Sequence, residues 1–121
     1  MLVSQMLRYA RVLLTAGWAQ GAEARDEQGK PVEPRDVMAV SWSLAGAIRA
    51  AARDAGDEEG ELERDASAAL ALVLETPADE LPAWNDDPRR TRRDVLAACD
   101  CAVELVPELV AQHVAVVGGG R

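Results

Sequence analysis

Apolar residues recur three and four positions apart in every long segment of this chain, and glycine or proline interrupts the pattern between segments. This periodicity is typical of amphipathic helices rather than of strands. The chain is also rich in alanine, which favours helix and lets helix backbones approach each other closely. We therefore predict an all-α protein with four principal helices.

Start and stop signals place the first three helices. Gly17 ends the first helix, and Asp36 caps a second one that runs to about Ala55. Pro77 ends the third helix. Short links favour antiparallel neighbours, so these helices and the fourth should form a compact up-down-up-down bundle.

Two long connections separate the helices. Residues 18–35 contain the turn Asp26–Gly29, where we expect one short hairpin that pairs Ala22–Arg25 with Lys30–Val32. Residues 77–90 carry three prolines and four acidic residues, and we expect no regular structure there.

The fourth helix begins at a capping box formed by Thr91 and Asp94. Pro107 either kinks this helix or divides it. With 121 residues, the chain has room for one core. We predict a single helical domain over residues 1–117 and a frayed glycine-rich tail over residues 118–121.

The predicted core follows from the apolar stripes of the four helices. Its members should be largely buried in the centre of the bundle: Leu13, Val40, Leu44, Leu70, Val73, Leu96, Cys99 and Val103.

The charge of the chain argues against one class of partner. A net charge of -8 and a pI of about 4.6 oppose binding to a phosphate backbone, so we expect no nucleic-acid partner.

The N-terminal apolar segment is interrupted by Arg8 and Arg11, so we expect neither a signal peptide nor a membrane span. With two cysteines, the protein is predicted to be cytoplasmic.

The cysteines do not form a metal-binding pattern. Cys99 and Cys101 lie on different sides of a helix, and His113 has no ligand spacing to them. We therefore predict no metal and no cofactor.

The three tryptophans should lie at one end of the bundle. Trp18 and Trp84 fall in the two long connections, and Trp42 falls near the start of the second predicted helix. In an up-down-up-down order both long connections lie at the same end, together with the N-termini of the second and fourth helices.

Polar residues accompany these tryptophans, and their roles have two interpretations. Asn85 and Asp86 follow Trp84 and either contact a ligand or shape the turn while Trp84 plugs the bundle. Gln20 and Asp26 have the same two interpretations, with hydrogen bonds that stabilise the loop as the simpler one.

A run of four arginines lies at the start of the fourth helix, over residues 89–93. Cations oppose the helix dipole at an N-terminus. The arginines, Arg90 among them, either bind an anion or are neutralised by nearby acids: Asp79, Glu80, Asp86 and Asp87.

Several short motifs resemble a known family. They are Gly17–Gly21, Asp26 with Gly29, Trp42–Ala47, and Leu81–Asp86 followed by Arg90 and Thr91. Together they resemble a family of short bacterial proteins that form a domain of unknown function, over about residues 7–103. The resemblance implies one compact domain and no particular activity.

Three functional hypotheses follow. The first is a non-enzymatic protein-interaction or regulatory module that binds another protein, or itself as a homodimer, through the tryptophan-bearing end. The second is a pocket for a small molecule or anion at that end, formed by the following residues: Trp18, Gln20, Asp26, Trp42, Trp84, Asn85, Asp86 and Arg90. The third is an enzyme on a small anionic substrate, which requires a titratable group with a strongly shifted pKa in that pocket.

Overall fold

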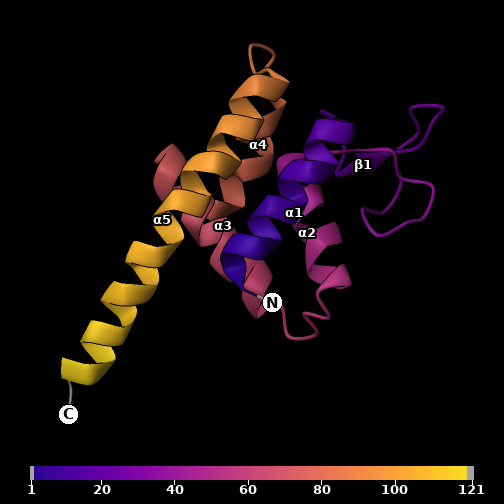
Figure 1. The fold of residues 1–121 in the computed structure, drawn as a ribbon. Helices are drawn as coiled ribbons and strands as arrows, with labels where there is room; N and C mark the ends of the chain where they lie inside the picture. The colour runs from indigo at the N-terminus through magenta and orange to yellow at the C-terminus, as the bar shows by residue number, and fades with distance from the viewer. Residues whose placement is uncertain (1, 120–121) are drawn as a thin grey trace.

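The computed structural model describes residues 2–119, and the side chains of residues 2–106. This part of the chain is mostly helical and has a small two-strand antiparallel sheet (Figure 1). Its elements are α1 Val3–Ala16, β1 Ala24–Arg25, β2 Ser41–Trp42, α2 Leu44–Asp54, α3 Glu61–Leu74, the 3₁₀ turn η1 Ala78–Glu80, α4 Leu81–Asp86 and α5 Arg92–Gly119.

Helix α1 lies at the centre of the packing, because it contacts α2, α3 and α5. Its buried side chains Leu7 and Leu14 belong to a core that also includes Ile48 of α2 and Val95 of α5. Alanines on all four of these helices belong to this core: Ala10, Ala47, Ala51, Ala66, Ala69, Ala98 and Ala102. Short side chains at these positions let the backbones approach each other, as the alanine-rich composition predicts.

Three of the eight predicted core residues are buried in the core. Leu44, Leu70 and Cys99 are fully buried, as predicted. Four others are only partly buried and pack against the edge of the core: Leu13, Val73, Leu96 and Val103. Val40 is 41% exposed, so its prediction is wrong.

The second helix begins later than predicted. Asp36 does not cap it, because the Asp36 side chain accepts the Met38 N–H (2.8 Å) in a turn. Ser43 caps α2 instead, where its hydroxyl oxygen accepts the Gly46 N–H (3.0 Å). Residues 34–40 therefore form a loop, which explains why Val40 is exposed.

The small sheet differs from the predicted hairpin. The predicted turn is present, since the Asp26 N–H bonds to the Lys30 carbonyl (2.9 Å) and the Val32 N–H to the Ala24 carbonyl (3.0 Å). The strand partner of β1, however, is β2, with Ala24 opposite Trp42. Trp42 therefore lies in a strand and not in a helix.

The segment between α3 and α5 is more ordered than predicted. Residues 77–90 contain the turn η1 and the short helix α4, which the three prolines do not prevent. Pro82 occupies the first turn of α4, where a missing N–H costs nothing.

Helix α5 begins as predicted. Asp94 accepts the Thr91 N–H (3.0 Å), and the Thr91 hydroxyl accepts the Asp94 N–H (3.3 Å). The helix is not divided at Pro107 and extends to Gly119. Of the predicted tail, residues 118–119 belong to α5, and residues 120–121 lie outside the described part.

Two glycines allow segments to approach each other closely. A Cβ atom on Gly17 would overlap the Val40 carbonyl oxygen, and one on Gly46 would overlap the Glu23 carbonyl oxygen. Gly46 lies in the first turn of α2. Neither position has room for a larger residue, so both glycines fix how the loops pack on α1 and α2.

Polar contacts connect the helices at the surface. The Arg11 side chain on α1 bonds to Asp100 on α5 (2.6 Å), and Tyr9 donates to Asp54 on α2 (2.6 Å). Within the described residues, no helix combines the length and apolar composition needed to cross a membrane.

Candidate functional site

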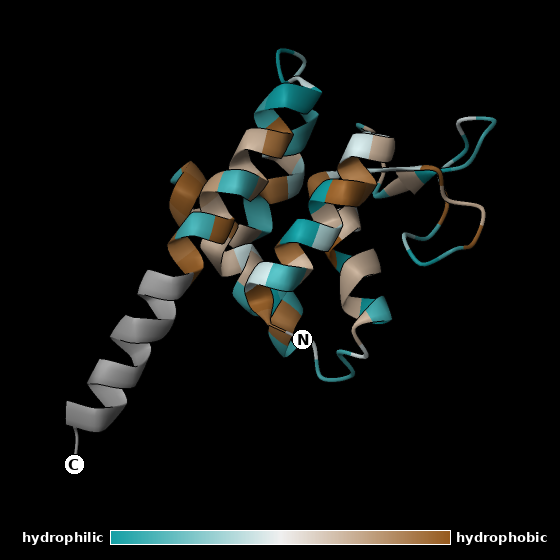
Figure 2. Cartoon of the chain, in the orientation of Figure 1, coloured by the Kyte–Doolittle hydropathy of each residue, from teal (hydrophilic) through white to brown (hydrophobic). Residues whose placement is uncertain are grey.

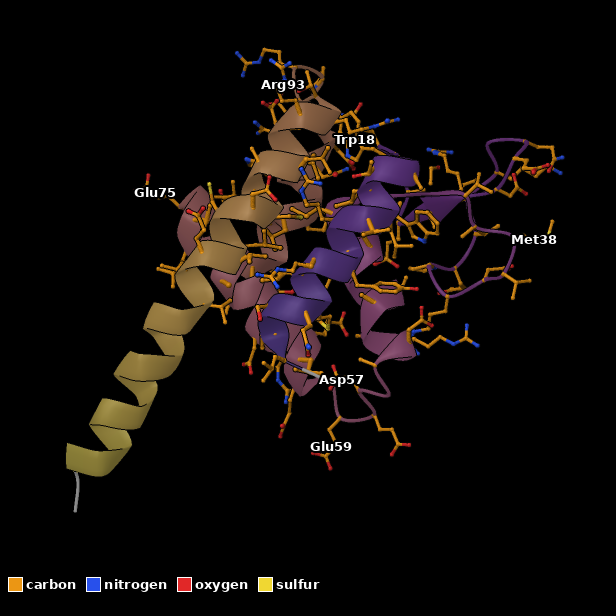
Figure 3. The ribbon with its side chains drawn as sticks, viewed as in Figure 1. Trp18, Met38, Asp57, Glu59, Glu75 and Arg93 are labelled. Atoms are coloured by element: carbon orange, nitrogen blue, oxygen red, sulfur yellow. The ribbon has the colours of Figure 1, made fainter. Side chains whose placement is uncertain are left out.

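Trp18 and Trp42 lie side by side, at the end of the molecule where α5 begins (Figure 3 labels Trp18 there). The Trp42 N–H donates to the Gly17 carbonyl, and the Ala19 N–H donates to the Trp42 carbonyl (both 2.9 Å). The indole N–H of Trp18 donates to Asn85, which follows Trp84 on α4 (2.8 Å). The structure thus brings the two long connections together, as the sequence predicts.

Asn85 is the centre of this site. It is completely buried, and its amide group makes four hydrogen bonds. Its oxygen accepts the Trp18 indole N–H (2.8 Å) and the Leu44 backbone N–H (3.1 Å). Its nitrogen donates to the Ala19 carbonyl (3.0 Å) and to Asp86 (3.0 Å).

These four bonds use both donors and both acceptor positions of the Asn85 amide. They also fasten α4 to the loop after α1 and to the N-terminus of α2. Asn85 is therefore a buried residue that joins three segments by hydrogen bonds. Its amide has no donor or acceptor position left for a ligand.

Gln20 and Asp86 extend this network. The Gln20 amide nitrogen donates to the carbonyls of Asn85 (3.0 Å) and Asp87 (2.9 Å). Asp86 accepts the Gly21 N–H (3.0 Å). Both residues therefore hold the loop after α1 against the C-terminal end of α4.

Trp84 and Arg90 interact with each other. The Arg90 guanidinium carbon lies 3.9 Å from the centre of the Trp84 ring, and its Nε donates to the Trp84 carbonyl (2.9 Å). The Trp84 ring thus covers one face of the Arg90 guanidinium, and the hydrogen bond uses its Nε–H. Both side chains are partly buried.

The other arginines of the run are only partly neutralised by the predicted acids. Among the four acids, Asp87 alone pairs with an arginine in the described residues, at 3.5 Å from Arg89. The Arg89 backbone N–H donates to the Asp87 carboxylate, and this bond lowers the pKa of Asp87. Arg92 instead donates to the Thr15 carbonyl (3.4 Å).

Asp26 lies away from the other predicted site residues. Its carboxylate accepts the N–H groups of Gln28 and Lys30 (both 2.9 Å) and so shapes the turn. Figure 1 shows this turn extending away from the helices, beyond β1. The structure therefore does not bring Asp26 to Asn85.

Two of the predicted site residues, Asp86 and Trp42, line two different clefts. One, of about 240 Å³, is lined partly by Asp86, Glu23 and Pro82. The other, of about 380 Å³, contains Trp42 and Tyr9 and lies between α1, α2 and the loop over residues 34–40. The Trp42 indole N–H donates to the Pro34 carbonyl (3.1 Å) at its edge.

The second cleft belongs to a surface that the sequence analysis missed. Its loop presents Val37, which is 93% exposed, and Met38, which is 58% exposed. Figure 3 shows Met38 pointing away from the helices, and Figure 2 shows hydrophobic colour on this loop. The second helix was predicted to begin at Asp36 and so included residues 37–40.

A turn signal in the sequence could have located this loop. The Asp36 N–H bonds to the Glu33 carbonyl (3.0 Å), which makes Pro34 the second residue of a β-turn, a position that proline favours. A second turn follows, because the Ala39 N–H bonds to the Asp36 carbonyl (3.1 Å).

Among the described residues, the groups with a clearly shifted pKa are not arranged as a catalytic set. Burial raises the pKa of the Cys99 thiol to about 12, so Cys99 is a poor nucleophile. The hydrogen bond to Asp54 raises the pKa of Tyr9, which makes it a weaker acid. In the same part of the chain, no three His, Cys, Asp or Glu side chains cluster as metal ligands.

Comparisons with known proteins identify the family. No curated protein and no solved structure matches this chain. A family of unknown function, DUF6197, matches residues 1–105, which include α1 to α4 and the first half of α5. The chain belongs to this family of unknown function.

Proposed function

We propose that this protein is a non-enzymatic protein-interaction module that binds its partner through one surface. We call it the loop surface and define it by the loop over residues 34–40 and the residues beside it: Tyr9, Leu13, Trp42, Ala50, Arg53 and Asp54. The observation that carries the proposal is the exposure of Val37 and Met38 at the tip of this loop.

The loop is held in place although its apolar side chains face solvent. Arg53 donates to the Arg35 carbonyl, and the Val40 N–H donates to the Arg25 carbonyl (2.9 Å). The Trp42 indole fixes the Pro34 carbonyl. A fixed loop loses little conformational entropy when a partner binds, which favours affinity.

Exposed apolar side chains also extend along α1. Val12 is 66% exposed and lies one turn from Tyr9. Apolar side chains gathered on one surface are typical of protein-binding sites, whereas isolated ones need no explanation. The cleft between α1 and the loop gives a partner side chain a place to insert.

The polar groups of the tryptophan-bearing end support this choice over the small-ligand pocket. The whole Asn85 amide, the Gln20 amide nitrogen and the Arg90 Nε form hydrogen bonds within the molecule. The cleft beside Asp86, about 240 Å³, is smaller than the roughly 300–1,000 Å³ of ordinary ligand pockets. Met38 does not line the other cleft, so a small ligand there would leave the Met38 side chain uncovered.

The proposal includes two structural expectations. We propose that α1, α2, α3 and α5 form an up-down-up-down bundle as a rigid scaffold, which the contacts of α1 with α2 and α5, and of α3 with α5, support. We also propose a cytoplasmic location, which the two free cysteines support.

The test is affinity capture from native extract with three baits. These are the wild-type chain, the double variant Val37→Asp with Met38→Asp, and the control Leu72→Asp. Leu72 is 57% exposed on α3, outside the loop surface. We expect a protein that the wild type and the control retain and the double variant loses. Equal retention by all three baits would contradict the proposal.

A further inference from the structure

We infer that the loop surface binds a second copy of this chain, so that two protomers dock across a two-fold axis. The inference rests on the proposed function and names its partner. Two features of the loop surface support it: its shape and its charge.

The shape of the loop surface suits a copy of itself. Val37 and Met38 project into solvent at the edge of the cleft that contains Tyr9 and Trp42. In a two-fold dimer the same patch occurs on both protomers, so residue i meets residue j and residue j meets residue i. The projecting side chains of each protomer can therefore enter the cleft of the other.

The charges of the loop surface also suit a copy of itself. Two guanidinium groups, of Arg35 and Arg53, line the cleft with two carboxylates, of Asp36 and Asp54. These charges cancel, although the whole chain carries -8. Like chains normally repel at that charge, and a locally neutral patch is where two copies can meet with least repulsion.

The arginines of the cleft lack partners for their charge. Among the described side chains, neither Arg35 nor Arg53 forms an ion pair with a carboxylate. A second copy brings Asp36 and Asp54 to the same interface. The second copy therefore supplies carboxylates that can pair with Arg35 and Arg53, next to the exposed apolar side chains that the dimer would bury.

The loop surface is small, so the dimer should be weak. About a dozen residues from each protomer take part, fewer than the roughly 20–30 a side of stable complexes. We expect a reversible dimer with a dissociation constant on the order of 1–100 μM.

The experiment is sedimentation equilibrium of the purified full chain, from about 1 to 500 μM, a range that brackets that constant. Wild type should approach twice the 12.9 kDa chain mass as the concentration rises. The Val37→Asp variant should raise the dissociation constant by roughly 100-fold or more, because each substitution acts twice in a two-fold dimer. Leu72→Asp should leave it unchanged.

Three outcomes would overturn the inference. They are a monomeric wild type at every concentration, a dimer that Val37→Asp leaves intact, and a dimer that Leu72→Asp disrupts equally. Val37 is 93% exposed, so its variant should keep the wild-type melting temperature and helical circular dichroism. A monomeric wild type that still captures another protein through Val37 and Met38 would overturn this inference alone and leave the proposed function standing.

Discussion

Asn85 shows how a single residue can look functional in the sequence and be structural in the fold. Its place after Trp84 in a proline-flanked segment predicted either a ligand contact or a turn. In the structure its side chain is buried and bonds to groups that lie 41 to 67 residues earlier in the chain. Sequence patterns identify local turns, but they do not show which distant groups a buried amide meets.

We predict that Asn85→Ala lowers the free energy of unfolding by at least about 3 kcal/mol. The substitution leaves the Trp18 indole N–H, the Leu44 N–H and the Ala19 carbonyl without their partner, at about 1–3 kcal/mol each. Urea denaturation followed by tryptophan fluorescence measures the change.

The neighbouring variant Asp86→Ala is the control for Asn85→Ala. Asp86 accepts the Gly21 N–H and one Asn85 N–H, but it is exposed, so water can replace it at both, and its loss should cost only about 1 kcal/mol. Equal effects of the two substitutions on the free energy of unfolding would show that the Asn85 hydrogen bonds are not what holds the three segments together.

At the scale of elements, caps and breakers located most helix ends. Gly17 and the Thr91–Asp94 box act as the sequence predicts. The predicted start of α2 was wrong because Asp and Ser are both good N-caps, so Asp36 and Ser43 are both candidates. The choice between them depends on tertiary contacts. Trp42 pairs with β1, and Gly46 packs against Glu23, so only Ser43 can begin the helix.

We predict that Gly46→Ala destabilises the protein by about 1–3 kcal/mol. Helix propensity alone predicts the opposite, a gain of about 1 kcal/mol. The added Cβ would overlap the Glu23 carbonyl oxygen, so the strand region must move away from α2. Thermal and chemical denaturation both measure this, and Ala68→Gly on the exposed side of α3 calibrates the propensity effect.

A Gly46→Ala protein that is more stable than wild type would contradict the close approach of α2 to β1. The same contact explains why a glycine interrupts an otherwise alanine-rich helix start. A glycine in a helix can therefore indicate close packing against another backbone. The sequence does not show which distant segment provides that backbone.

At the scale of the whole molecule, the helical class and the gathering of the two long connections at one end followed from the sequence. Helical periodicity and short links determine those features. The position of the loop surface did not follow, because a helix begun at Asp36 leaves no loop over residues 37–40. The site prediction rested on the three tryptophans instead, and it placed the candidate site at the tryptophan-bearing end.

The central claim is that the loop surface, and not the tryptophan-bearing end, meets the partner. The most direct measurement places a photo-crosslinking amino acid at position 38 of the full chain in the native cell, with position 72 on α3 and position 84 on α4 as controls. We predict a discrete adduct with a protein, whether another copy or a different chain, from position 38 and no matching adduct from positions 72 and 84. An adduct from position 84 with none from position 38 would contradict the account.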